Sequence, residues 1–275
     1  MKAWTQNLHM HSTFDDGKDS CRKMLLACRK AGLRSAGVCL HSPLPFPNDW
    51  SGRGTQTFSL EMGVLRRELA PFHVYTGIEV DSRSRGLDLK AFDYVIGAVH
   101  YLGGGEVPLS VDESPEISRR LVNECFGGSA DRAAQAYYEE VVRHCSRPEV
   151  DIVAHLDLIS KFEETDPLYD PDSPKIHSAA MEAVRALVRE DKIFEINTGA
   201  MSRGYRTSPY PRIDLLEEIA RLGGRVTISS DAHSADAVTF GFDQALEVAR
   251  QAGLRELWQL SGQPGKQVVF DPVPV

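Results

Sequence analysis

The residues best suited to chemistry are nine histidine, aspartate and glutamate residues at or just beyond the ends of short β-rich runs. They are His9, His11, Asp16, His41, Glu79, His100, His155, Asp231 and His233. Side chains two positions apart on a strand project to the same side, so His9 and His11 point together. Asp231 and His233 do the same if their strand is still extended there. Chance placement would not repeat at successive strand ends, so the pattern predicts a shared metal site.

Six imidazoles and three carboxylates are more ligands than one ion takes, because a tetrahedral zinc usually has three or four protein ligands. The number suits two or three ions that share a bridging carboxylate. Mixed nitrogen and oxygen ligands favour Zn, Mn or Fe over Mg or Ca alone. Such ions lower the pKa of bound water towards about 7, so hydrolysis is the expected chemistry.

The other three histidines are expected to be structural. His73 lies just before a predicted strand, His144 near the C-terminal end of a predicted helix and His177 inside one. His144 is well placed to interact with the helix dipole.

Short β-rich runs alternate with longer amphipathic stretches along the chain. The expected strands cover residues 3–8, 35–40, 74–80, 94–99, 151–154, 193–197 and 225–229. The expected helices cover residues 20–31, 59–69, 131–145, 174–190 and 213–222, and a last helix from about residue 243 precedes a short apolar tail. Strand, helix, strand repeated in this way means a parallel sheet. Seven units without a Gly-x-Gly-x-x-Gly turn favour a closed or nearly closed barrel over a dinucleotide-binding sheet.

The chain has no linker rich in Pro, Gly or Ser, so we expect one domain over residues 1–275. Two insertions, residues 43–57 and 103–130, each follow a strand end that carries a histidine. In a barrel they would be the loops over the active site and would hold the residues that recognise the substrate. The alternative is that both are plain surface loops.

The composition bounds the class of protein. A length of 275 residues with 42% hydrophobic residues is ample for one large α/β core. A net charge of -8, from 31 basic and 39 acidic residues, argues against a surface for long nucleic acid. An anionic substrate would then need a local positive charge, which divalent metals would supply.

The remaining composition favours a cytoplasmic protein without a membrane partner. No apolar run approaches the ~20 residues that cross a bilayer, and the start MKAWTQNLHMH lacks the apolar stretch of a signal peptide. The five cysteines are odd in number and include no Cys-x-x-Cys. Reduced packing thiols are therefore expected, rather than a disulfide framework or a zinc ribbon.

Seven segments together resemble the PHP superfamily, and specifically its monofunctional histidinol-phosphate phosphatases. In chain order they are HMHSTFDDG (9–17), HSPLPF (41–46), YTGIEVD (75–81), FDYVIGAVHYL (92–102), DIVAHLDLISKF (151–162), FEINTGAMSRG (194–204) and VTISSDAH (226–233). The match runs in order over nearly the whole chain. It is therefore more specific than the Asp-Ala-His and His-x-His pairs, which other metallohydrolases share.

The resemblance implies a distorted (β/α)7 barrel with a trinuclear metal centre at the C-terminal ends of the strands. Three ligand sets are implied: His9, His11, Glu79 and Asp231; Glu79, His100 and His155; and Asp16, His41 and His233. Glu79 would be the bridge. Asp15 is the alternative to Asp16, and Ser229 stands where the family often has glycine.

The implied activity is hydrolysis of the small phosphate monoester L-histidinol phosphate to L-histidinol and phosphate, in histidine biosynthesis. Attack by a metal-bridging hydroxide is implied, with catalytic roles for the metal ligands Glu79, His155, Asp231 and His233. Three divalent ions and three carboxylates would leave the centre at about +3, which attracts a phosphate. The alternatives are a PHP phosphoesterase for another small ester, such as a nucleotide or sugar phosphate, and a non-enzymatic module that kept the barrel.

Two cations are predicted to contact the substrate phosphate. Lys161 and Arg203 follow the fifth and sixth strands, where each could reach a phosphate oxygen beyond the metals. A solvated surface position is the alternative for both, and it is the expectation for Arg206. Glu195 could face the barrel like Asn197, and packing or hydrogen bonding to the backbone is its expected role.

Overall fold

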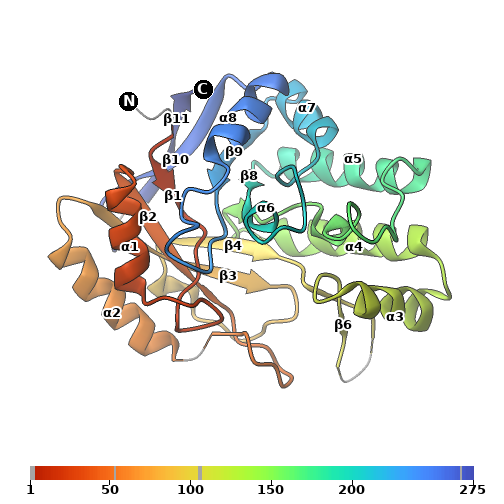
Figure 1. Ribbon diagram of the computed structural model, residues 1–275, viewed down its shortest axis with the longest axis horizontal. Coiled ribbons are helices and arrows are strands. Elements are labelled where there is room, and N and C mark those ends of the chain that lie inside the picture. Colours follow the sequence, from red (N-terminus) through yellow and green to blue (C-terminus); the bar gives the residue numbers. More distant parts are fainter. Residues whose placement is uncertain (1–3, 53, 105–106, 267) are drawn as a thin grey trace.

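The computed structural model describes residues 4–52, 54–104, 107–266 and 268–275. Its main feature is a sheet of seven parallel strands in the order β1-β2-β3-β4-β7-β8-β9 (Figure 1). They are β1 (Gln6–Asn7), β2 (Ser35–His41), β3 (His73–Asp81), β4 (Tyr94–Ala98), β7 (Ile152–Val153), β8 (Ile193–Asn197) and β9 (Arg225–Ser229). A bridge between Met10 and Ala232 joins the two ends of the sheet. The predicted nearly closed seven-stranded barrel is confirmed.

The predicted helices surround the sheet in Figure 1. They are α1 (Cys21–Lys30), α2 (Thr55–Glu68), α4 (Ala130–Cys145), α5 (Pro174–Arg189), α7 (Ile213–Arg221) and α8 (Phe242–Gln251). In α1 the buried residues recur at the helical period, so one stripe faces the sheet. The helix starts after Ser20, whose hydroxyl accepts a hydrogen bond from the Lys23 amide. Most helix ends lie within a residue or two of the prediction, but α2 starts four residues earlier than expected, at Thr55.

The insertion at residues 103–130 is more ordered than the predicted loop. Strand β6 (Leu109–Ser110) pairs with β5 (Tyr101–Leu102), and helix α3 (Pro115–Phe126) follows. The Ser114 hydroxyl caps the start of α3, and Gly127, with φ of 61°, ends it. The prediction of a loop was wrong because it relied on the glycines that flank this insertion and did not use the residues that cap the helix. The first insertion, residues 43–57, overlaps the start of α2 at Thr55.

The C-terminal tail was also predicted with too little structure. After α8 the chain forms an antiparallel hairpin of β10 (Glu256–Gly262) and β11 (Val268–Pro274). The side chain of Gln6 accepts a hydrogen bond from the Leu260 amide and donates one to the Leu260 carbonyl, at 2.8 and 2.7 Å. Leu260 is buried in the same cluster as Tyr75 and Tyr94. The hairpin therefore closes the end of the barrel that lies opposite the strand ends carrying the histidines.

Two composition-based expectations can be compared with the structure. All five cysteines are free, and Cys125 alone among them is exposed, as expected for packing thiols. In the described ranges, no helix has both the length and the apolar character needed to cross a membrane.

Three short helices lie between these elements. The 3-10 helices are η1 (Leu89–Ala91) and η2 (Leu158–Ser160), and α6 (Gly199–Ser202) is a single turn after β8. Both η2 and α6 follow strand ends, so they border the site described next.

Candidate metal centre

Glu79 lies at the centre of the predicted site. It shares the inner face of β3 with Tyr75 and Gly77, because side chains alternate along a strand. Its carboxylate is 1% exposed, and five imidazoles surround it. Ring nitrogens of His9, His11 and His41 lie 3.4, 3.5 and 2.8 Å from Oε2, and those of His100 and His155 lie 3.5 and 3.1 Å from Oε1.

Two groups of possible metal ligands are fully buried. One consists of His9, His11 and Asp231, and the other of Glu79, His100 and His155; in each group one ligand atom per residue lies within 4.8 Å of the others. The Nε2 atoms of His9 and His11 are 3.7 and 3.5 Å from Asp231 Oδ1. These residues come from β1, β3, β4, β7 and β9 or the turns after them, so the barrel brings their ends together.

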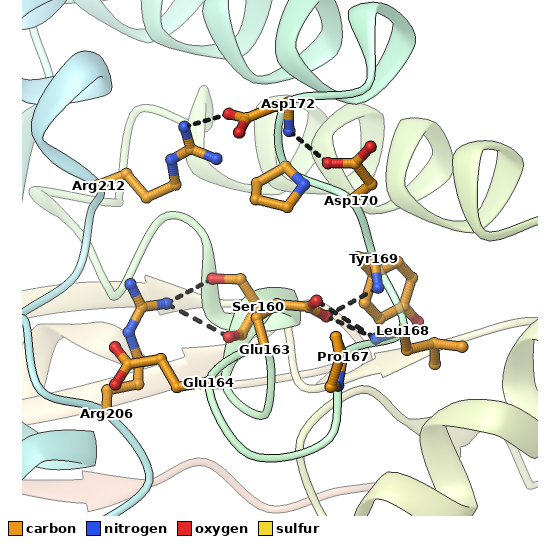
Figure 2. Close-up of a pocket in the computed structure, with 11 residues that line it drawn as sticks. Ser160, Glu163, Glu164, Pro167, Leu168, Tyr169, Asp170, Asp172, Arg206 and Arg212 are labelled. Carbon is orange, nitrogen blue, oxygen red and sulfur yellow. Dashed lines mark hydrogen bonds and ion pairs between the residues drawn. The ribbon is translucent and has the colours of Figure 1, made fainter.

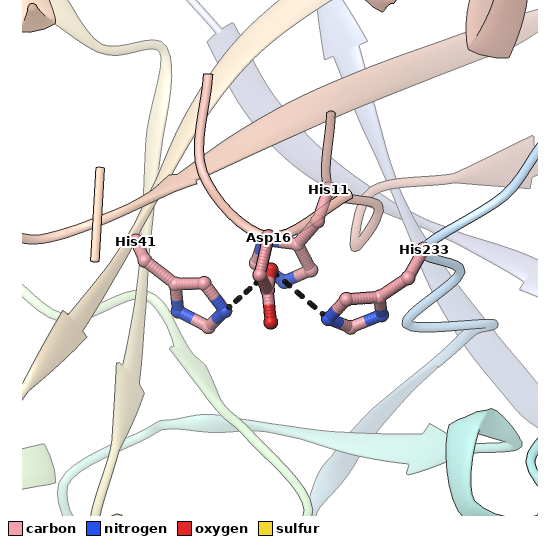
Figure 3. Close-up of side chains that lie close together, drawn as sticks. All are labelled: His11, Asp16, His41 and His233. Carbon is pink, nitrogen blue, oxygen red and sulfur yellow. Dashed lines mark ion pairs between the residues drawn. The ribbon is translucent and has the colours of Figure 1, made fainter. Parts of the chain in front are cut away.

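A third group, drawn in Figure 3, includes an exposed and a half-buried residue and so lies nearer the solvent. It contains His11, Asp16, His41 and His233. Asp16 Oδ1 lies between two rings, 3.5 Å from His41 Nε2 and 3.3 Å from His233 Nε2. All nine predicted residues are thus in one place.

Asp15 and Asp16 have different positions in this group. Asp15 is turned inward, where it accepts hydrogen bonds from the backbone amides of Ser12 and His41 at 2.9 and 3.0 Å. Its Oδ2 also lies 2.9 Å from His11 Nδ1. Asp16 is 34% exposed and faces the rings. The geometry therefore favours Asp16 as a ligand and Asp15 as a residue that orients His11.

The donor set fits divalent cations. Across the part of the chain that the structure describes, the buried Nε2 atoms of His9 and His11 have no hydrogen-bond partner. A buried polar atom without a partner costs about 1–3 kcal/mol. Two ligands bonded to one tetrahedral ion at about 2.1 Å are roughly 3.4 Å apart. The separations of 3.4 and 3.5 Å between these nitrogens and Glu79 Oε2 match that arrangement.

Three further carboxylates orient the rings. Each lies beside the Nδ1 atom of a histidine: Glu195 at 2.7 Å from His9, Asp15 at 2.9 Å from His11 and Asp81 at 3.2 Å from His100. A carboxylate at this position fixes the ring and turns Nε2 towards the metal site. No pattern along the chain assigns these roles to Asp15 or Asp81.

Glu195 has a larger role than predicted. It accepts hydrogen bonds from the His155 backbone amide and from Asn197 Nδ2, at 3.0 and 2.8 Å, which fits the expected backbone contact. The missed partner is His9, which follows β1, two strands away from β8 around the barrel. One pattern in the sequence did point to this role. Glu195 and Asn197 are two positions apart on a strand that ends at the site, so their side chains project to the same side.

The imidazoles keep the buried carboxylates ionised. Burial alone would raise the pKa of Glu79, but His41, His9 and His100 hold it well below the usual value. For Asp231, burial is likewise outweighed, chiefly by His9 and Arg203. Burial lowers the pKa of His9, yet Glu195, Asp231 and Glu79 together raise it well above the usual value. The Glu79 and Asp231 carboxylates are therefore ionised and available to bind a cation.

The two predicted phosphate-binding cations border one cavity of about 670 Å³ above the centre. Arg203 donates from Nη1 to the Asp231 carbonyl at 3.0 Å and from Nη2 to Asp231 Oδ2 at 3.2 Å. Lys161 donates to the Asp112 carbonyl and to Asp112 Oδ2, at 2.7 and 3.0 Å. Lys161 is 9% exposed, so the solvated-surface alternative is wrong for it.

Arg206 was expected on the surface, and that expectation was wrong. It is buried, and it donates to Ser160 Oγ at 2.6 Å and lies 4.6 Å from the Tyr210 ring. Together with Arg212 it borders a second hollow of about 590 Å³, drawn in Figure 2. Of the described residues that line this hollow, none is among the nine predicted ligands.

The three remaining histidines lie outside the ligand groups, as predicted. His144 is buried, and its Nε2 lies 2.8 Å from the Val80 carbonyl oxygen. His177 lies 3.4 Å from Asp214. His73 is exposed at the start of β3.

A barrel with histidine and carboxylate clusters at its strand ends defines a class of metal-dependent enzymes. The chain belongs to the PHP domain family, which matches residues 7–199. Several of the proteins that it resembles are named histidinol-phosphatases.

A probable histidinol-phosphatase of Schizosaccharomyces pombe is 26% identical over 186 residues. The match covers 66% of this chain and 58% of the yeast protein, less than two thirds of its length. A probable histidinol-phosphatase of Deinococcus radiodurans is 27% identical over 248 residues, which are 85% of this chain and 88% of that protein.

The fold is shared with a histidinol phosphate phosphatase of Lactococcus lactis whose crystal structure contains zinc, L-histidinol and phosphate. The TM-score is 0.74 at 22% sequence identity, and the match covers 96% of this chain and 98% of that one. At this identity the likeness shows the barrel architecture.

Proposed function

We propose that this protein is a metal-dependent phosphomonoesterase that hydrolyses L-histidinol phosphate to L-histidinol and phosphate. The observation that carries the proposal is the convergence of five imidazoles on the buried Glu79 carboxylate. The relatives named as histidinol-phosphatases support the choice of substrate. The free cysteines fit a role in the cytoplasm, where thiols stay reduced.

The proposed cofactor is two to three divalent ions of Zn, Mn or Fe. Three sets of residues would hold them: His9, His11, Glu79 and Asp231; Glu79, His100 and His155; and Asp16, His41 and His233. Glu79 has one oxygen towards each buried set, which suits a bridging ligand. When bound, such ions activate water and neutralise charge on a phosphoryl group.

The protein residues would position and hold the phosphate. Arg203 borders the cavity beside Asp231 and His233, and its planar guanidinium can offer two parallel donors to phosphate oxygens. Lys161 uses hydrogen bonds to Asp112 for its orientation, and an ammonium has a third N–H to offer. Glu79, His155, Asp231 and His233 would act by fixing the ions at the reacting phosphorus.

Metal content and activity test this proposal together. Purified protein should contain about two to three equivalents of transition metal, and extensive chelation should abolish hydrolysis of histidinol phosphate until metal is restored. Full activity after complete chelation would contradict the metal role.

Substrate comparison separates this function from the alternative. The turnover of histidinol phosphate should be compared with that of p-nitrophenyl phosphate, nucleotides and sugar phosphates. Comparable efficiency for all of them would favour a PHP phosphoesterase of another or broader specificity.

A further inference from the structure

The cavity over the metal centre has a second wall that the phosphate chemistry does not use. One side is formed by the ligand groups with Arg203, and the other by the loop after β2 and the segment from β6 into α3. A volume of about 670 Å³ lies in the range of sites for complete small molecules. The cavity therefore has room for the alcohol half of a phosphate ester.

Trp50 supplies the flat part of this wall. Its ring lies edge-to-face with His41 and His100, at centroid distances of 4.6 and 5.4 Å. Its indole nitrogen donates to the Tyr101 hydroxyl at 2.8 Å, with the two rings parallel and 6.0 Å apart. These contacts fix the ring, which stays half-buried and borders the cavity. A fixed indole beside open space suits a flat or cationic group.

Glu113 supplies the negative charge. Ser110 Oγ accepts hydrogen bonds from the backbone amides of Asp112 and Glu113, at 3.2 and 3.0 Å, so the turn is held in place. The neighbouring Asp112 carboxylate is occupied by Lys161, 3.0 Å away. The Glu113 side chain is exposed and borders the cavity. Among the described residues, the Glu113 carboxylate has no hydrogen-bond or ion-pair partner, since only its backbone amide makes a hydrogen bond.

We propose that Trp50 and Glu113 determine specificity for the alcohol half of the substrate. The Trp50 ring would stack on the imidazole, and the Glu113 carboxylate would pair with the ammonium. This inference rests on the proposed function, and it defines the substrate class as a phosphate monoester whose alcohol carries both a flat ring and a cation.

Two trimmed substrates test each contact in the metal-loaded enzyme. One is 2-aminopropyl phosphate, which lacks the ring, and the other is 3-(imidazol-4-yl)propyl phosphate, which lacks the amine. Trp50→Leu should raise KM for histidinol phosphate about tenfold with little effect on 2-aminopropyl phosphate. Trp50→Phe keeps a flat ring and should recover most of the loss.

The charge is tested in the same way. Glu113→Gln should raise KM for histidinol phosphate about tenfold and leave the amine-free substrate unchanged. The matched control is Glu124→Gln, an exposed residue on α3 that pairs with Arg120 outside the cavity. Inhibition by L-histidinol should weaken by the same factors in the Trp50→Leu and Glu113→Gln variants.

The outcomes separate this inference from the proposed function. If the wild-type enzyme treats all three substrates alike, the assignment of histidinol phosphate fails. If the wild type prefers histidinol phosphate and both variants keep that preference, the function stands and the proposed subsite is overturned. A loss of equal size on all three substrates would also overturn it, because it would mean damage to the metal centre.

Discussion

Two hollows meet at residues 158–161, and they hold charged side chains in different ways. Leu158 and Lys161 border the cavity of the metal centre, whereas Ser160 borders the second hollow (Figure 2). All three groups of converging histidine and carboxylate atoms found in the described ranges lie in the metal centre. In the second hollow, charges instead pair off, as Arg212 does with Asp172 at 2.9 Å. Convergence of ligand atoms, rather than density of charge, therefore marks the place for a cation.

The carboxyl pKa values differ between the hollows in the same sense. In the metal centre, imidazoles outweigh burial and lower the pKa of Glu79. Beside the second hollow, burial dominates and raises the pKa of Asp157 and of Glu163. The surroundings of the first set of carboxylates therefore favour the ionised form, whereas burial of the second set disfavours it.

The largest expected effect is at Glu79. Glu79→Gln keeps the shape and removes the charge that faces five imidazoles, so kcat/KM should fall roughly a thousandfold or more. Metal content should fall with it, while circular dichroism stays that of the folded barrel. Retention of both metal and activity would show that the ligand atoms converging on Glu79 do not form a metal site that the reaction needs.

A smaller effect is expected at Glu195, which acts through His9. Glu195→Gln weakens the acceptor at His9 Nδ1 and should reduce metal affinity or activity by about 10- to 100-fold. Glu190→Gln, at the exposed end of α5, is the matched control and should have no effect. The midpoint of a metal titration measures the affinity of each variant. An unchanged midpoint for Glu195→Gln would mean that Glu195 only packs against its neighbours.

A substitution in the second hollow should change the stability of the protein and leave its activity unchanged. Arg212→Gln breaks partly exposed pairs with Asp172 and Asp214, which together are worth about 1 kcal/mol because exposed pairs contribute little. Thermal unfolding should therefore shift by about 2–4 °C at most, with kcat/KM within about twofold of wild type. A tenfold loss of activity would mean that this hollow takes part in the reaction.

The smallest effect is expected at Asp157 and depends on pH. Because burial raises the pKa of Asp157 in the folded protein above 3.8, ionisation above that folded pKa opposes folding. Wild-type stability should thus fall relative to Asp157→Asn as pH rises from about 4 through the folded pKa. Denaturant titrations at several pH values measure the free energy of unfolding of both proteins, and a wild-type stability that rises relative to that of Asp157→Asn with rising pH would contradict the sign.

The barrel was readable from the sequence because periodicity and strand ends carry local signals. Strands β8 and β9 have the predicted bounds. Strands β1 and β7 are shorter than expected over the described residues, since each pairs over only two residues, and residue 3 of the expected first strand lies outside the described ranges. The C-terminal hairpin was missed because its stability comes from contacts with Gln6, some 250 positions away in the chain.

The ligand positions were predictable for the same reason, since nine suitable residues stood at strand ends. The residues that orient them were not, because each acts across a distance that only the fold defines. Glu195 reaches His9 across 186 positions, and Arg203 reaches Asp231 across 28. The choice between Asp15 and Asp16 as the ligand needed the structure, in which the Asp15 oxygens accept hydrogen bonds from backbone amides.

The bridge between Met10 and Ala232 is the backbone pairing that joins β1 to β9 within the described residues. His9 and His11 lie on one side of this seam, and Asp231 lies on the other in the same ligand group. A cation shared by them would cross-link the first and last strands of the sheet. Metal binding and pairing of the first and last strands would then be thermodynamically coupled. The bound ions would make the barrel more rigid in the absence of substrate.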